Sequence, residues 1–366
     1  MPLSSKCGLL AGVVSTIALF SAGSAQIAPA QDPRAYLRVF RLSASQCSKL
    51  LRSSEQPRRP SWLSGRAKTG VGLVYASQPF ADIVNISSVG AGGLTPAGQL
   101  TLGQNSVPVG LHVDAAKNLY VTISALFGSP AIPSVQVFPP GASQPSAVYK
   151  QGLAGPLDVA IDKHGTLYVA DLEQHGGGAC NARVGGSDGR IVVFAKGSMK
   201  PTATITDVPG CPQGIAVDAS ASLYVSYLYY PPSGLALSDV REYAYQSTKG
   251  TELNLNVPGG PQLGGLSVDT KGNLIISNVQ DDATLGQLLT FAAGSKTPTS
   301  AIQYGGEGWH PHFFVRRGDR LFTSAFISEN LTGTLAEFDY PSGRELLVQN
   351  PTLTSTPFLY GFAASP

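Results

Sequence analysis

Short apolar runs, separated by turn residues such as Gly, Pro, Asp and Asn, recur along the chain from residue 71 onward. The stretch Pro156–Asp171 shows the pattern most clearly, because one apolar run ends at Asp162 and a second, Leu167–Ala170, ends just before Asp171. Runs of this length between turn residues are typical of β-strands. The unit recurs about every fifty residues, a period that favours a propeller or a solenoid.

Six copies of the unit can be aligned, each with an inner strand, a second strand and two further strands. The second strands begin at Leu73, Leu119, Leu167, Leu223, Leu274 and Leu321. The first copy lacks an inner strand, and the end of the chain supplies one, Phe358–Ala363, which we expect to pair with Leu73–Ser77. A solenoid would need capping repeats at both ends and has no use for a split unit. The pattern therefore predicts an all-β fold, a closed six-bladed β-propeller with four-stranded blades over residues 71–366.

The repeat is also similar to a known sequence family. Gly165–Asp171, followed by Gly189–Phe194, resembles the NHL repeat, and looser copies cover nearly all of residues 71–366. The resemblance implies a six-bladed propeller of the NHL and gluconolactonase-like superfamily. It implies no single function, since such propellers include scaffolds, binding modules and a few lyases and lactonases.

Composition agrees with an all-β fold and divides the chain by charge. The 366 residues are 43% hydrophobic and only 13% charged, with 42 Gly and 27 Pro. Residues 26–70 hold nine basic and two acidic residues, a net charge of +7, whereas residues 71–366 hold fifteen basic and twenty-one acidic residues, a net charge of −6. The acidic propeller repels phosphate, which argues against a nucleic-acid partner.

The amino-terminal 70 residues are expected to lie outside the propeller. Lys6, the apolar run Leu9–Phe20 and the small residues Ala22–Ala25 predict a signal peptide over residues 1–25, hence a secreted or extracytoplasmic protein. The alternative is an uncleaved amino-terminal anchor. Residues 26–70 are predicted to be a basic linker. Apolar residues at three- and four-residue steps, Leu37 to Leu51, are compatible with a short amphipathic helix that would lie on an anionic membrane surface or on the acidic propeller.

Three long connections from second to third strands would emerge on one face of blades 2, 3 and 4. They are Ile123–Ser134, Leu172–Gly189 and Tyr227–Asp239. Long loops on a rigid scaffold commonly carry binding sites, so we expect a ligand or partner on this face. Aromatic rings there would suit a protein, peptide or glycan partner, or would pack on their own loop.

The candidate binding residues lie in these loops or near the mouth of the central channel. They are Asp171, His175, Tyr227, Tyr229, Tyr230, Trp309, His310 and His312. A histidine pair at the channel mouth, with His112 on an inner strand, could bind metal or act as a general base, although exposed or structural histidines are commoner. Asp171 stands out because the other blades carry a different residue at its position, Asn278 in blade 5.

No metal site and no cofactor are predicted from these residues. Gluconolactonase-like propellers bind a divalent metal through an early Glu, two Asn and an Asp. This chain departs from that set, since Ser61–Ser64 occupies the region of the Glu and only Asp171 and Asn278 match in kind. Cys180 and Cys211 would emerge on the same face and are predicted to form a disulfide, the alternative being two free thiols; Cys47 is left over.

Three hypotheses about function remain open from the sequence. The first is an exported, monomeric binding module that uses the loop face of blades 2 to 4. The second is a metal-dependent hydrolase or lyase, lactonase-like, with a site at the channel mouth and a divalent metal. The third is a structural cell-envelope protein held by its basic amino-terminal segment, residues 26–70.

Overall fold

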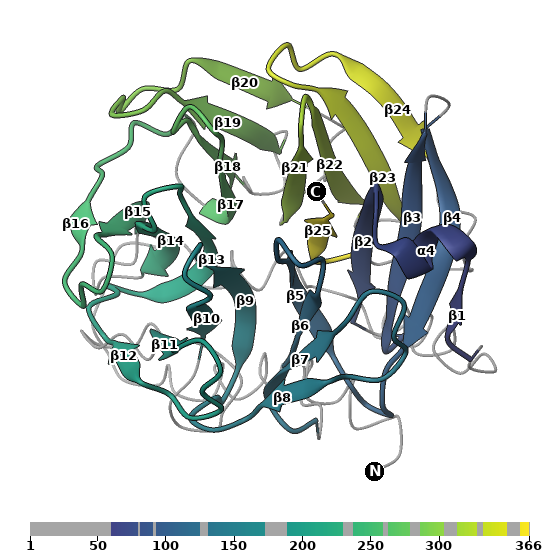
Figure 1. Cartoon of the computed structure of the whole chain (residues 1–366). Coiled ribbons are helices and arrows are strands. Elements are labelled where there is room, and N and C mark those ends of the chain that lie inside the picture. Colours follow the sequence, from purple (N-terminus) through teal and green to yellow (C-terminus); the bar gives the residue numbers. More distant parts are fainter. Residues whose placement is uncertain are drawn as a thin grey trace, which may run out of the picture.

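The computed structural model describes most of the propeller and the eleven residues before it. The described residues are 60–79, 81–90, 93–124, 131–172, 189–229, 237–258, 263–278, 286–303, 313–327, 332–349 and 359–365. They form six antiparallel sheets arranged as blades around a ring, as predicted (Figure 1). None of the helices in this part of the chain has the length and hydropathy of a membrane span.

Blades 2 to 6 each contain four strands in the order inner, second, third and outer. Blade 2 comprises β5 (Pro108–Val113), β6 (Leu119–Ile123), β7 (Ser134–Phe138) and β8 (Ala147–Tyr149). Blade 3 comprises β9 (Pro156–Ile161), β10 (Leu167–Asp171), β11 (Arg190–Phe194) and β12 (Ala203–Ile205). Blade 4 comprises β13 (Cys211–Val217), β14 (Leu223–Tyr229), β15 (Leu237–Tyr243) and β16 (Thr251–Glu252).

The remaining blades complete the ring. Blade 5 comprises β17 (Leu263–Val268), β18 (Leu274–Asn278), β19 (Gln287–Phe291) and β20 (Ser300–Gln303). Blade 6 comprises β21 (Phe314–Arg317), β22 (Arg320–Ile327), β23 (Thr332–Asp339) and β24 (Glu345–Gln349). Blade 1 comprises β2 (Leu73–Gln78), β3 (Ile83–Gly90) and β4 (Gly93–Thr101), flanked by β25 (Phe362–Ala364) and β1 (Trp62–Leu63).

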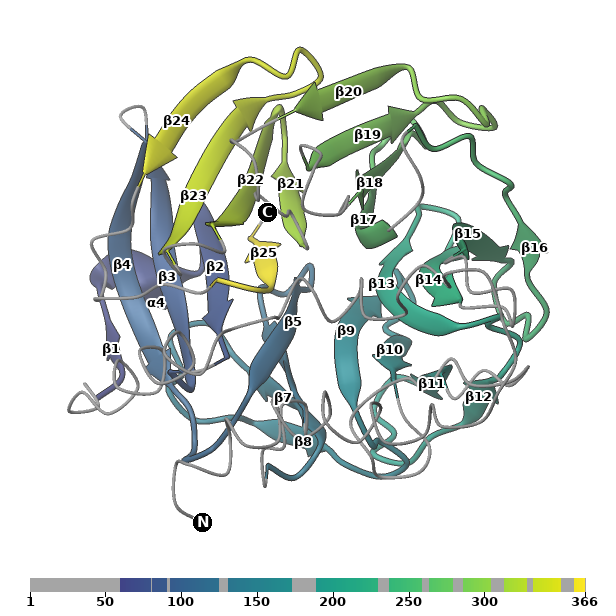
Figure 2. The same ribbon diagram turned by 180° about the vertical axis from the view of Figure 1, so that it is seen from behind.

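The carboxyl-terminal strand closes the ring, as the split repeat predicted. Strand β25 is the inner strand of blade 1 and pairs antiparallel with β2, with Ala363 opposite Tyr75. Seen from either side, β25 takes its place among the inner strands around the centre (Figures 1 and 2). Two distant parts of the chain thus share one sheet, so main-chain hydrogen bonds hold the two ends of the propeller together.

Blade 1 has one strand more than predicted, because residues before 71 join it. Strand β1 pairs with the outer strand β4, with Trp62 opposite Gln99. Helix α4 (Gly65–Thr69) follows; its first turn is capped by Ser64, whose hydroxyl accepts the amide of Ala67 at 3.2 Å. Of the basic segment 26–70, residues 60–70 therefore lie on blade 1 as part of its structure, while the predicted amphipathic helix lies outside the described residues.

Hydroxyl groups near the ends of the second strands join neighbouring blades. Each donates a hydrogen bond to a carbonyl on, or just before, the inner strand of the next blade. The pairs, with their oxygen–oxygen distances, are Ser77 and Val109 (2.7 Å), Thr122 and Leu157 (3.3 Å), Ser226 and Gly264 (2.6 Å), and Ser324 and Leu359 (3.0 Å). Because both partners are buried, these bonds are made in place of bonds to water.

Glycine on the inner strand makes this contact between blades sterically feasible. A Cβ on Gly214 would lie 2.7 Å from the carbonyl oxygen of Gly264. A Cβ on Gly110 would overlap the carbonyl of Leu157 and lie 2.6 Å from the Cα of Asp158. Both obstacles are backbone atoms that cannot move aside, so only glycine fits here.

Blade 3 makes the same connection with different residues. It carries Ala170 where the other blades have a hydroxyl, and Asp158 where blades 2, 4 and 5 have a glycine. The Oδ2 atom of Asp158 instead accepts the amide of Ile215 on β13 of blade 4, at 2.9 Å. Burial raises the pKa of this carboxyl to about 7, although the amides of Ile215 and Val159 favour its charged form.

Tight turns connect inner and second strands on the other face, which we call the turn face; the loop face is its opposite. In blade 3, the Oδ1 atom of Asp162 accepts the amides of His164 and Thr166, each at 2.8 Å. Asp218 and Asp269 each accept two amides of the corresponding turns in the same way, and Asp114 accepts the amide of Asn118. These aspartates are therefore structural parts of the repeat.

Substitution of Gly110 by Ala should strongly destabilise the ring. The new Cβ would collide with the backbone of blade 3, and overpacking of this kind costs about 3 kcal/mol. The matched control is Gly65→Ala on α4, where a Cβ would meet nothing within 4 Å. Urea unfolding should show a large loss for Gly110→Ala and none for Gly65→Ala; equal stabilities would refute the close-contact argument.

Asp158 should make stability depend on pH. Its folded-state pKa, about 7, exceeds the ordinary 3.8, so the folded protein holds more protons between these values. The free energy of unfolding should then fall as pH rises through this window, by up to roughly 4 kcal/mol. Asp158→Asn keeps an acceptor for Ile215 and should lack this dependence. The test is urea unfolding of both proteins from about pH 4.5 to 8; a constant difference between them would contradict the prediction.

Candidate binding face

The loop face is formed where second strands end and inner strands begin. The connections from second to third strands in blades 2 to 4 are described only in part, because residues 125–130, 173–188 and 230–236 lie outside the described residues. The flanking strand ends are described, and they show what the predicted residues at the base of these loops contact.

Asp171 ends β10 and is fully buried, with its carboxylate oxygens taken up by donors of the protein itself. The carboxylate accepts the amides of Ala154 at 3.0 Å and Gly155 at 2.6 Å, on the connection that leads into β9. It also forms an ion pair with Arg190 at 2.8 Å. Burial raises the pKa of Asp171, against the lowering effect of these amides and of Arg190. Asp171, which was predicted to bind a ligand, therefore fixes the connection that leads into the inner strand of its own blade.

The same position has a related role in blade 5. Asn278 is also fully buried, and its Nδ2 donates to the carbonyl of Pro258 at 3.4 Å, on the connection that leads into β17. In blade 1 the position is Gln78, which is 2% exposed and whose side-chain polar atoms have no partner among the described residues. The polar residue at this position therefore has a structural role in blades 3 and 5.

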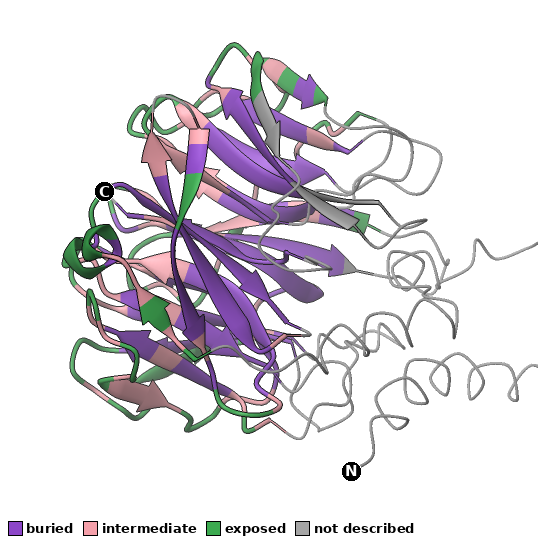
Figure 3. Cartoon of the chain, turned by 90° about the vertical axis from the view of Figure 1, so that its right-hand side faces the viewer, coloured by how far each residue is buried: buried purple, intermediate pink, exposed green. Residues whose placement is uncertain are grey.

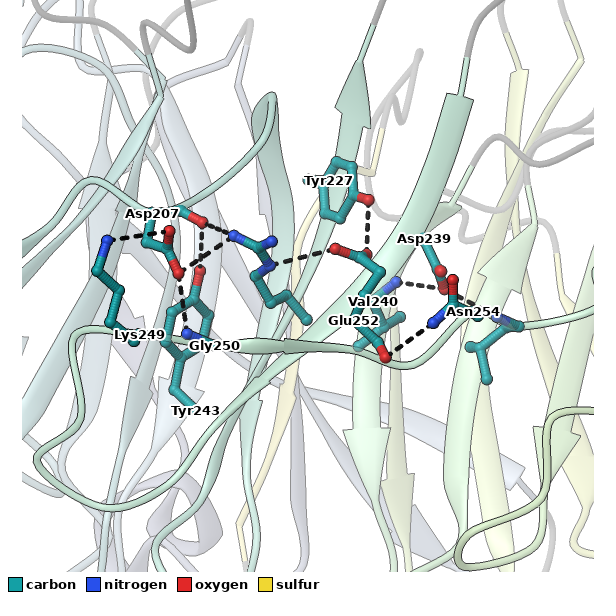
Figure 4. A network of polar contacts seen from close by, with 11 residues as sticks. Asp207, Tyr227, Asp239, Val240, Tyr243, Lys249, Gly250, Glu252 and Asn254 are labelled. Carbon is teal, nitrogen blue, oxygen red and sulfur yellow. Dashed lines mark hydrogen bonds and ion pairs between the residues drawn. The ribbon is translucent and has the colours of Figure 1, made fainter.

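Tyr227 was expected to contact a partner or to pack on its own loop, but it lies in the interior between blades 3 and 4. The residue is 7% exposed, and its hydroxyl donates to Glu252 at 2.6 Å. Glu252 accepts from Arg241 at 3.1 Å, and Arg241 pairs with Asp207 at 3.2 Å (Figure 4). Burial, followed by the bond to Glu252, raises the pKa of Tyr227 above its ordinary range. This ring anchors β14 to the outer strand β16.

Most other predicted binding residues lie outside the described part of the chain. They are His175, Tyr230, Trp309, His310 and His312, and only the backbone of Tyr229 is described, at the end of β14. Cys180 is outside it as well. Cys211 is buried at the start of β13, and its pairing with Cys180 stays a prediction.

The inner strands begin in apolar surroundings on the loop face. Val109, Leu157, Cys211, Phe313 and Leu359 belong to one buried cluster that joins five of the six blades. His112 lies farther along β5, where burial lowers its pKa to about 4 although Asp114 favours its charged form. Among the described residues, no group of three His, Cys, Asp or Glu side chains is placed to hold a metal ion.

Two exposed aliphatic side chains border the long loops, and the sequence analysis missed both. Ile132, before β7 of blade 2, is 66% exposed, and Leu237, at the start of β15 of blade 4, is 51% exposed. They are the two most exposed large hydrophobic residues in the described part of the chain. The signal that could have found them is an aliphatic residue placed just before a third strand, at the end of a long connection.

Comparison with protein-family models and with curated proteins gives no significant match. The resemblance to the NHL repeat therefore rests on the residues of the repeat alone. The fold is that of a six-bladed propeller.

Substitution of Asp171 should lower the stability of the fold, because the residue has a structural role. Asp171→Ala leaves Arg190 and two amides without their acceptor, and removal of one partner of a buried pair costs about 3 kcal/mol. In a double-mutant cycle, Asp171→Ala with Arg190→Ala should cost less than the sum of the single changes. Urea unfolding provides the measurement. Unchanged stability of Asp171→Ala would overturn this structural role and favour a role in binding.

Proposed function

We propose that this protein is an exported, NHL-like propeller that binds a protein or peptide through the loop face of blades 2 to 4. The observation that carries the proposal is the exposure of Ile132 and Leu237 beside the long loops. Exposed aliphatic side chains cost solvation free energy, which a partner's apolar surface recovers on binding. Aliphatic contacts suit a protein or peptide better than a glycan, which is recognised mainly by polar groups and aromatic rings.

The scaffold supports this use of the face. The ring is closed by β25 and joined by buried hydroxyl–carbonyl bonds between blades, so the bases of the loops are fixed relative to one another. A preorganised surface loses less conformational entropy on binding. The strand ends that flank the long connections belong to this frame, whereas the turn face is built from short aspartate turns.

Export and the predicted disulfide belong to the same proposal. The segment 1–25 has the composition of a signal peptide, and an exported protein meets conditions in which Cys180 and Cys211 can oxidise. A disulfide between them would tie the blade 3 loop to the start of β13 and restrict the loop face further.

Replacement of the two aliphatic residues should weaken binding without loss of the fold. Peptides selected from a phage-displayed library on the full protein should bind the variant Ile132→Asp, Leu237→Asp at least about 10-fold more weakly. Both side chains are exposed, so urea unfolding should change little. The matched control is Met199→Asp, since Met199 is 44% exposed on the turn between β11 and β12, away from the loop face.

The two variants separate the outcomes. If the double variant binds the peptides more weakly and Met199→Asp binds them as wild type does, the result supports binding through the loop face. Equal binding to wild type and to the double variant would refute it. A glycan array probed with the same proteins tests the alternative ligand class, and a glycan that binds equally well to both would place the site elsewhere.

A further inference from the structure

Basic side chains from three separate elements gather on the turn face beside blade 1. Arg66 and Lys68 come from α4, Lys117 from the turn between β5 and β6, and Arg317 from the end of β21. Gly70, the carboxyl-terminal cap of α4, lies against Lys117, with an added Cβ only 3.3 Å from that of Lys117. Figure 3 shows α4 exposed on the side of the molecule that carries the carboxyl-terminal mark.

These four side chains have no carboxylate partner among the described residues. The ion pairs there use other cations: Arg190, Arg241, Lys249 and Arg320. The turn of blade 6 also departs from the repeat. Where blades 2 to 5 have an aspartate that accepts backbone amides, the strand pairing of blade 6 places Arg317, which reverses the charge at this point of the face.

Two guanidinium groups converge on Gly72, just before β2. A Cβ on Gly72 would lie 3.4 Å from a terminal nitrogen of Arg66 and 3.7 Å from one of Arg317. The sum of these distances, 7.1 Å, is the largest separation that the two nitrogens can have. Gly72 has a φ of 67°, which favours glycine, so the space between the guanidinium groups stays free of a side chain.

Arg317 is held in place by the end of the chain, and Arg66 by its position on a capped helix. The Nε atom of Arg317 donates to the carbonyl of Ser365 at 2.9 Å, which leaves its terminal nitrogens toward Gly72. Arg66 projects from α4, which is capped at both ends by Ser64 and Gly70. Like charges repel at this distance, so the arrangement gains stability when an anion lies between them.

We propose that Arg66 and Arg317 form a binding site for a phosphate group, with Lys68 and Lys117 adding to the positive potential. A phosphate offers several oxygens, and an arginine donates charge-assisted hydrogen bonds of about 2.8 Å to such groups. One oxyanion over Gly72 would accept from both arginines. This site lies on the turn face and does not depend on the binding proposed for the loop face.

Calorimetric titration of the full protein with inorganic phosphate at low ionic strength tests the site. We expect saturable binding that Arg66→Gln weakens at least about 10-fold, because one of the two donors is lost. Arg317→Gln should weaken it similarly. The matched control is Lys271→Gln, an exposed lysine in the equivalent turn of blade 5, which should bind within about twofold of wild type.

The side chain of Arg317 also bonds to the carbonyl of Ser365, so Arg317→Gln can change the stability of the fold as well as phosphate binding. The exposed Arg66 makes no such side-chain bond among the described residues. Arg66→Lys, which keeps the charge and loses the fork of donors, should bind with intermediate affinity. Absence of saturable binding to wild type, or equal affinity in Arg66→Gln and Lys271→Gln, would overturn the proposal.

Vesicles of phosphatidylglycerol, compared with vesicles of phosphatidylcholine, distinguish the two sources of a phosphate group. Vesicle binding that Arg66→Gln abolishes identifies a lipid headgroup as the ligand. Binding to free phosphate alone identifies a soluble ligand.

Discussion

Hydroxyl–carbonyl hydrogen bonds between blades are the interaction on which the ring depends. A hydroxyl at the end of a second strand, such as that of Ser226, can reach the next inner strand only if the two backbones nearly touch. That contact requires glycine at positions such as Gly214, where a Cβ would collide with blade 5. The hydroxyl on the second strand and the glycine on the inner strand are therefore coupled: without the hydroxyl the close contact makes no hydrogen bond, and without the glycine the contact cannot form.

Blade 3 shows how the chain meets the same constraint with other chemistry. Ala170 cannot donate a hydrogen bond, and Asp158 takes the place of the glycine, so the bond between blades runs from the amide of Ile215 to a carboxyl group. A buried carboxyl is less costly when protonated, which is why burial raises its pKa to about 7. The blade with the longest loop-face connection is thus also joined to its neighbour by a titratable group.

The ring could be predicted well from the sequence because a repeated unit reveals itself by comparison of its copies. The split first blade, the closing strand near Phe362 and the turn aspartates such as Asp162 all followed from that comparison. Contacts between residues distant in the chain could not be predicted in this way. Tyr227 looked like a loop aromatic because its partners, Glu252 and the core between blades 3 and 4, come from other strands.

The candidate site was harder to predict for the same physical reason. Asp171 is unique in its position along the repeat, and uniqueness suggested a ligand, yet its partners are the amides of Ala154 and Gly155. Arg66 and Arg317 are 251 positions apart and meet only because β25 closes the ring beside blade 6 and the segment that carries α4. In a closed propeller, the role of a residue that departs from the repeat depends on its neighbours in space, and ring closure determines which residues those are.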